Sequence, residues 1–83
     1  MSQWELIGDK YVNKRSGRVV SRGLVDRVYG VLGEEWMTLR EISRLSGYSY
    51  AAVFSAVEVL KEMGIVERRK REGAKGWLWR RRV

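Results

Sequence analysis

The side chains that could do chemistry in this chain are mainly cationic and aromatic. Its 83 residues include 17 Lys and Arg, 10 Asp and Glu, four Trp and four Tyr, but no His and no Cys. Imidazoles and thiols are the commonest general bases, nucleophiles and zinc ligands. The adjacent acidic residues Glu34 and Glu35 lie in a polar linker, where sequence neighbours seldom face one another. We therefore expect no catalytic residues, no cofactor, no metal site and no enzymatic activity.

The positive charge gathers at the two ends of the chain. Residues 1–32 carry six basic and three acidic side chains, residues 33–60 two and four, and residues 61–83 nine and three. The net charges are therefore +3, −2 and +6, which add up to +7. Basic ends favour a polyanionic partner, first nucleic acid and second an acidic membrane surface, although a solubilising surface is the simpler interpretation. The sequence shows no apolar run of membrane-spanning length and no signal peptide, so we expect a cytoplasmic protein without a membrane partner.

Residues 38–66 predict two helices joined by a tight turn. Thr38 and Glu41 have the spacing of a capping box, in which each side chain bonds the other's backbone N–H. The first helix has apolar residues at helical spacing: Leu39, Ile42 and Leu45. Gly47 follows Ser46 and can adopt the left-handed conformation that ends a helix. A helix–Gly turn–helix unit is therefore expected.

The second helix of this unit is predicted at 49–63. Ser49 is placed to cap it, and Val53, Val57 and Leu60 form one apolar stripe. Gly64 ends the helix, and Ile65 begins a β-prone run.

The last third of the chain predicts a basic β-hairpin. Residues 65–71 and 77–83 form its strands, and the glycines at 73 and 76 lie in its turn. A very short strand is expected at Trp36 and Met37. Alternation places Trp77 and Trp79 on one face of the hairpin, where we expect them to pack on the helices. The alternative is a stacking platform for single-stranded bases.

Residues 1–20 predict a β-hairpin, with Lys10–Asn13 against residues 18–20, or alternatively a flexible basic arm. The basic side chains of this region are Lys10, Lys14, Arg15, Arg18 and Arg22. Such an arm can reach along DNA, but it can also be a solvated surface. A first helix is expected to begin at Ser21 or Arg22 and to end at Gly33, with an apolar face formed by Leu24, Val28, Val31 and Leu32.

From residue 36 to residue 83, this order of cap, short helix, Gly, Ser cap, longer helix and basic hairpin resembles the winged helix-turn-helix transcription regulators, including the multiple-antibiotic-resistance-regulator type. The resemblance implies an α+β domain over residues 21–83, with three helices, a two-stranded C-terminal wing and a short edge strand. It also implies that a homodimer binds double-stranded DNA, with helix 49–63 in the major groove. If the source is prokaryotic, the protein would be associated with the nucleoid.

The family pattern also assigns candidate DNA-binding residues. On the outward face of helix 49–63 these are Ser49, Tyr50, Phe54 and Ser55. Arg40 and Arg44, one turn apart on the preceding helix, would meet phosphates, and the wing would contribute Arg69, Lys70, Arg71 and Lys75. The outward helix face lacks the Arg, Lys, Gln and Asn residues that usually read bases. The alternative function is therefore a protein-interaction module that docks a partner on Tyr48, Tyr50 and Phe54.

Overall fold

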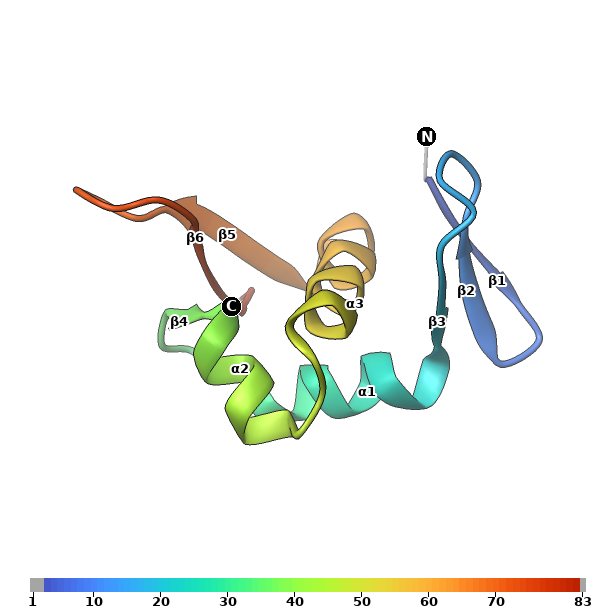
Figure 1. Ribbon diagram of the computed structural model, residues 1–83, viewed down its shortest axis with the longest axis horizontal. Coiled ribbons are helices and arrows are strands. Elements are labelled where there is room, and N and C mark those ends of the chain that lie inside the picture. The colour runs from blue at the N-terminus through green and yellow to red at the C-terminus, as the bar shows by residue number, and fades with distance from the viewer. Residues whose placement is uncertain (1–2, 83) are drawn as a thin grey trace.

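The structure, a computed structural model, describes residues 3–82, which form three helices and two small antiparallel sheets (Figure 1). Along the chain the elements are β1 (Trp4–Ile7), β2 (Lys10–Asn13), β3 (Val19–Ser21), α1 (Arg22–Val31), β4 (Met37–Thr38), α2 (Leu39–Ser46), α3 (Tyr50–Glu62), β5 (Val66–Lys70) and β6 (Trp77–Arg81). The predicted α+β class is therefore confirmed. No helix within the described residues is long and apolar enough to cross a bilayer.

Local capping signals set the helix boundaries as the sequence predicts. The Thr38 hydroxyl accepts a hydrogen bond from the Glu41 N–H at 3.1 Å, and the Glu41 carboxylate accepts one from the Thr38 N–H at 3.1 Å. Gly47 ends α2 with φ +80°, in the left-handed region that a residue with a Cβ rarely adopts. Ser49 then caps α3 by accepting from the Ala52 N–H at 3.2 Å. These contacts fix the turn between α2 and α3.

The hydrophobic core is centred on α3. Five apolar residues of this helix are buried: Val53, Ala56, Val57, Val59 and Leu60. The predicted stripe of Val53, Val57 and Leu60 is therefore confirmed. In α2, Leu39 and Ile42 are buried as expected, but the prediction for Leu45 is wrong. Leu45 is 60% exposed because the buried face of α2 runs through Leu39, Ile42 and Ser46. Leu45 lies outside this face, next to Ser46 in the sequence.

The C-terminal sheet has the strand order β4-β6-β5, so the short strand after α1 pairs with the last strand. Trp79 is completely buried beneath this sheet. Trp77 lies on the same face but is 36% exposed, so the expectation that it packs on the helices is wrong. The reason is its position at the start of β6, opposite Lys70 and next to the turn, where the hairpin extends beyond the helices.

The N-terminal sheet has the order β1-β2-β3. The predicted hairpin between β2 and β3 is present, and a third strand, β1, which the sequence analysis did not predict, pairs with β2. This sheet is fastened to the end of α3, because the Glu62 carboxylate accepts the N–H groups of Gln3 and Trp4 at 2.7 and 3.0 Å. Trp4 and Val20 belong to the same buried cluster as the helices. The N-terminal segment is therefore a folded sheet and not a flexible arm.

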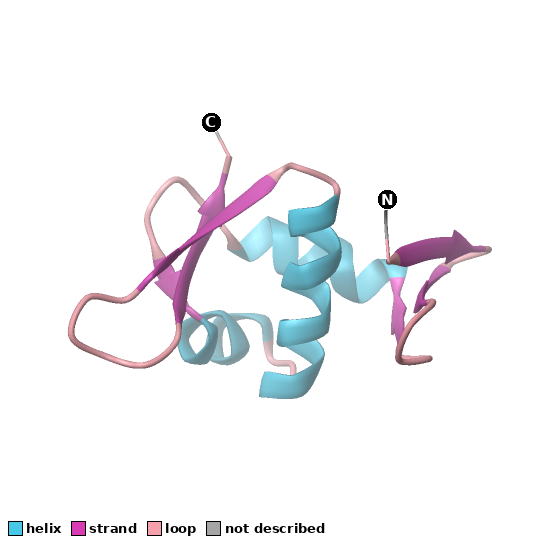
Figure 2. Ribbon diagram, turned by 90° about the horizontal axis from the view of Figure 1, so that it is seen from above, coloured by secondary structure: helices cyan, strands magenta, loops and turns pink. Residues whose placement is uncertain are grey.

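The two sheets lie on opposite sides of α3. Figure 1 shows α3 between β1–β3 on the right and the hairpin of β5 and β6 on the left. The view from above in Figure 2 agrees, and there α3 lies in front of the other two helices. One face of α3 is therefore not covered by another helix. The N-terminal sheet borders this face on one side and the hairpin of β5 and β6 borders it on the other.

We predict that Glu62→Ala loosens the N-terminal sheet without unfolding the helices. Two backbone N–H groups lose a charged acceptor, and hydrogen bonds to charged groups contribute about 1.5–3 kcal/mol each when shielded and less at a partly exposed site such as this. Amide hydrogen exchange followed by NMR should become faster in β1 and β2 but stay unchanged in α2. The exposed neighbouring substitution Lys61→Ala is the control and should leave both regions unchanged. Equal acceleration in α2 would contradict the prediction.

Candidate nucleic-acid interface

A cationic groove of about 510 Å³ lies where the C-terminal hairpin meets the first residues of α2 and α3. Its basic lining residues are Arg40 from α2 and Arg71 and Lys75 from the 71–76 turn. Tyr50, the first residue of α3, completes the wall with its 58% exposed side chain. No acidic residue lines this groove. Three cations and a phenol from separate segments thus face one cavity, an arrangement that suits a phosphate-bearing ligand.

A second hollow of about 400 Å³ follows the hairpin beside its turn. It is lined by Arg69, Lys70, Arg71, Glu72 and Leu78. Arg71 therefore borders both hollows, and three basic side chains face a single carboxylate in the second. The structure thus brings the four predicted hairpin cations into two adjoining hollows, with Arg71 shared between them.

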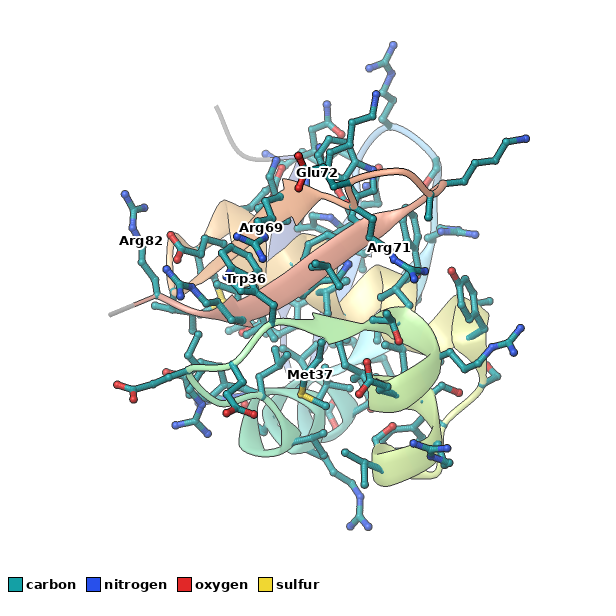
Figure 3. The ribbon with its side chains drawn as sticks, turned by 90° about the vertical axis from the view of Figure 1, so that its left-hand side faces the viewer. Trp36, Met37, Arg69, Arg71, Glu72 and Arg82 are labelled. Carbon is teal, nitrogen blue, oxygen red and sulfur yellow. The ribbon has the colours of Figure 1, made fainter. Side chains whose placement is uncertain are left out.

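Several arginines of the hairpin are held by aromatic rings, which the sequence analysis did not anticipate. The guanidinium of Arg69 lies 4.6 Å from the Trp36 ring centroid, and that of Arg80 lies 4.3 Å from the same ring. Figure 3 shows Trp36 beside Arg69, with Arg71 apart from this pair. A cation–π contact fixes the position of a guanidinium but leaves its N–H groups, which point outward in the guanidinium plane, available to other partners. Arg69 is therefore a positioned cation, whereas Arg71 has no such contact among the described residues.

A similar contact lies on the other face of the hairpin. The Arg68 guanidinium is 4.1 Å from the Trp77 centroid and 3.5 Å from a carboxylate oxygen of Glu58 on α3. Strand alternation contains the signal for the Arg68 stack, because the register sets Arg68 opposite Trp79 and on the same face as Trp77. The partner ring Trp36 could not be found in this way, because it lies before β4 and joins the sheet only through tertiary folding.

The outward face of α3 is smaller than the family pattern predicts. Ser55 is only 8% exposed, so the prediction that it faces outward from α3 is wrong. The N-terminal sheet covers it, and the Arg18 guanidinium lies 3.4 Å from its hydroxyl. Phe54 is half-buried against the core, and Ser49 is exposed but engaged as the helix cap. Tyr50 and Ala51 are the residues of the first turn of α3 that remain exposed.

The predicted aromatic docking patch is likewise reduced. Tyr48 and Phe54 are both partly buried and pack against the core. Tyr50 alone of the three is exposed. One exposed phenol is a small anchor for a protein partner, so the structure gives no particular support to the docking alternative.

Arg40 and Arg44 are both exposed on α2, one turn apart, as expected, but only Arg40 lines the groove. Between them lies Glu41, whose carboxylate is occupied by the cap. Hydrogen bonds from the backbone N–H and then the hydroxyl of Thr38 lower the pKa of Glu41, with smaller contributions from the positive charges of Arg44 and Arg71. The carboxylate beside Arg40 is thus an ionised part of the helix cap.

Comparisons of the chain with protein-family models, with curated proteins and with solved structures find no match. The function proposed below therefore rests on the residues and geometry of this chain.

We predict a pH-dependent contribution of Glu41 to stability. Because its pKa is lowered in the folded state, the ionised carboxylate stabilises the fold above the pKa of the unfolded chain, about 4.3. This stabilisation is lost as the pH falls through the lower, folded-state pKa. The difference in unfolding free energy between the wild type and Glu41→Ala should be constant near pH 7 and should shrink below about pH 4.3. Urea titrations followed by tryptophan fluorescence measure this difference.

Glu41→Gln is the matched control for this prediction. Glutamine can still accept the capping hydrogen bond but cannot ionise. Its difference from Glu41→Ala should therefore show no pH dependence. A difference between the wild type and Glu41→Ala that stays the same from pH 7 to pH 3 would contradict the assignment.

Proposed function

We propose that this protein is a winged helix-turn-helix protein that binds double-stranded DNA and regulates transcription in the cytoplasm. The order α1-β4-α2-α3-β5-β6 and the sheet order β4-β6-β5 support the winged helix-turn-helix assignment. The observation that carries the functional proposal is the cationic groove of Arg40, Arg71 and Lys75 beside the first turn of α3. Helix and cations are arranged as a groove-reading element next to a phosphate-binding one.

In this proposal the first turn of α3 enters the major groove. Tyr50 and Ala51 face the base edges, where a phenol can hydrogen-bond and a methyl group can contact thymine. The C-terminal hairpin acts as the wing, and Arg71 and Lys75 bind the adjacent phosphates. Arg40 and Arg44 meet the backbone on the side of α2. Phosphate contacts fix the position of the protein, while base contacts discriminate between sequences.

Weak sequence selectivity follows from the composition of the reading surface. The bidentate contacts that discriminate best come from Arg or Lys to guanine and from Asn or Gln to adenine. Helix α3 has none of these residues before Lys61, in its last turn. The selectivity that remains would come from Tyr50, from thymine methyl contacts and from DNA shape.

A homodimer is the proposed binding form. The described residues of one chain present the cationic groove, the adjoining hollow and the exposed first turn of α3, which together are a small contact surface for a duplex. Two copies on neighbouring half-sites would double the phosphate contacts. The stoichiometry in the titration below tests this proposal, because one chain per site would contradict it.

We predict salt-sensitive binding of duplex DNA that depends on Arg71 and Lys75. Fluorescence anisotropy with random and AT-rich duplexes, measured at several salt concentrations, gives affinity and salt slope. Each lost phosphate contact should reduce the slope by about 0.9, so Arg71→Gln combined with Lys75→Gln should reduce it by ~2 per protomer and weaken binding to both duplexes alike.

Lys10→Gln combined with Arg22→Gln is the matched control, because it removes the same charge where β2 begins beside the start of α1. It should leave most of the slope intact. Absence of duplex binding by the wild type at low salt would overturn the proposed function.

We also predict that Tyr50→Ala changes selectivity more than overall affinity. The side chain is 58% exposed and its removal should not disturb the core. The ratio of affinities for AT-rich and random duplexes should move toward one, while the salt slope should stay unchanged. Tyr48→Phe is the control because its hydroxyl lies outside the first turn of α3, and it should preserve the ratio. An unchanged ratio in Tyr50→Ala would exclude Tyr50 as a reading residue.

A further inference from the structure

The turn between β2 and β3 is built as a rigid, strongly basic loop. The Asn13 side-chain oxygen accepts the N–H groups of Arg15 and Ser16, both at 2.9 Å. The backbone closes the loop through Gly17 N–H to Asn13 O at 2.8 Å, and Gly17 adopts φ +76°. A loop held in this way has lost most of its conformational entropy before any ligand binds.

No acidic residue lies in this turn or in the strands on either side of it. From Lys10 to Arg22 the chain carries five basic residues and no acidic one. Lys14, Arg15 and Arg18 lie in or beside the turn itself and are exposed. The ion pairs found among the described residues, Arg68 with Glu58 and Arg80 with Glu67, do not involve them. The turn therefore presents three cations to solvent from a fixed backbone.

The turn between β2 and β3 lies beside α3. Arg18 reaches Ser55 in the middle of this helix, with 3.4 Å between the guanidinium nitrogen and the hydroxyl oxygen. The same sheet is fastened to the end of α3 through Glu62. In Figures 1 and 2 the N-terminal sheet borders α3 on the side opposite the hairpin of β5 and β6. A basic turn thus lies on each side of the exposed strip of α3.

We propose that the 13–18 turn is a second phosphate-binding element, which holds the DNA backbone across α3 from the C-terminal hairpin. Lys14 and Arg15 contact phosphates, and Arg18, anchored at Ser55, lies between the turn and the helix. This inference rests on the proposed function and extends it, because it gives each protomer two backbone contacts that straddle the groove entered by α3. The ligand is duplex DNA, whose two phosphate strands border a groove in the same way.

The test is the salt slope of duplex binding by Lys14→Gln combined with Arg15→Gln. Neither side chain has a partner in the hydrogen bonds and ion pairs of the described residues, so the variant should fold normally. Its slope should fall by ~2 per protomer relative to the wild type, as in the variant of Arg71 and Lys75. The Lys10 and Arg22 double variant removes equal charge from the other end of the same sheet. It should lower the slope by less than half as much.

A cross-link gives an independent measurement. The chain has no cysteine, so Ser16→Cys creates its single thiol. Labelled with an azidophenacyl group, it should cross-link to duplex DNA, whereas Asp9→Cys in the turn at the opposite end of the sheet should not. If the wild type and the Arg71 and Lys75 variant behave as proposed, but the turn variant matches the control slope or Ser16→Cys gives no cross-link, this inference is wrong and the proposed function stands. A wild type that binds no duplex overturns both.

Discussion

The fold depends on the burial of α3 between two sheets that are too small to be stable alone. A sheet of three short strands needs an apolar face packed against something else. Each sheet here contributes one buried tryptophan, Trp4 from β1 and Trp79 from β6, and both join the cluster around Val57 and Val59 of α3. The helix therefore carries apolar residues on two sides, which leaves only a strip for solvent. The same constraint that stabilises the domain also limits what α3 can present to a ligand.

The placement of charge follows from this packing. Because the inner faces of the sheets are occupied mainly by apolar side chains, most cations of the two sheets lie on outer faces and at hairpin tips. Arg68, which shares a face with the buried Trp79, is paired with Glu58 of α3. Other cations on the C-terminal strands are held by rings, as Arg69 and Arg80 are by Trp36, which reduces their conformational freedom without neutralising them. Those at the tips, such as Arg71 and Lys75, extend into the solvent. The cationic surface is thus a pair of rims around α3, and α3 itself contributes little positive charge.

The parts of this structure that could be predicted from the sequence are those set by local interactions. The unit of α2, turn and α3 was predictable because Thr38, Gly47 and Ser49 act on backbone groups within a few residues. The burial of Ser55 was not, because it depends on a contact with Arg18, 37 residues away. Strand β1 was missed for the same reason. Of its residues only Trp4 is buried, so the strand has no alternating pattern, and it is held by pairing with β2 and by Glu62. The groove combines both cases, since its members were predicted one by one but their convergence required the sheet order β4-β6-β5.

The one acidic residue in the middle of α3 bears on how this surface would meet DNA. Glu58 would repel phosphates if it stood alone, but the Arg68 guanidinium lies 3.5 Å away and is itself held over Trp77. A partly exposed ion pair of this kind contributes only about 1 kcal/mol to stability, so its main effect is on the local potential. With Glu58 compensated and no cation before Lys61, the exposed strip of α3 is nearly neutral over its first turns. In the proposed binding mode, electrostatic attraction would come from the flanking turns, which are indifferent to sequence, while the helix would contribute shape and a few short-range contacts. Such a division would make the affinity depend steeply on salt and the discrimination depend on very few residues, Tyr50 above all.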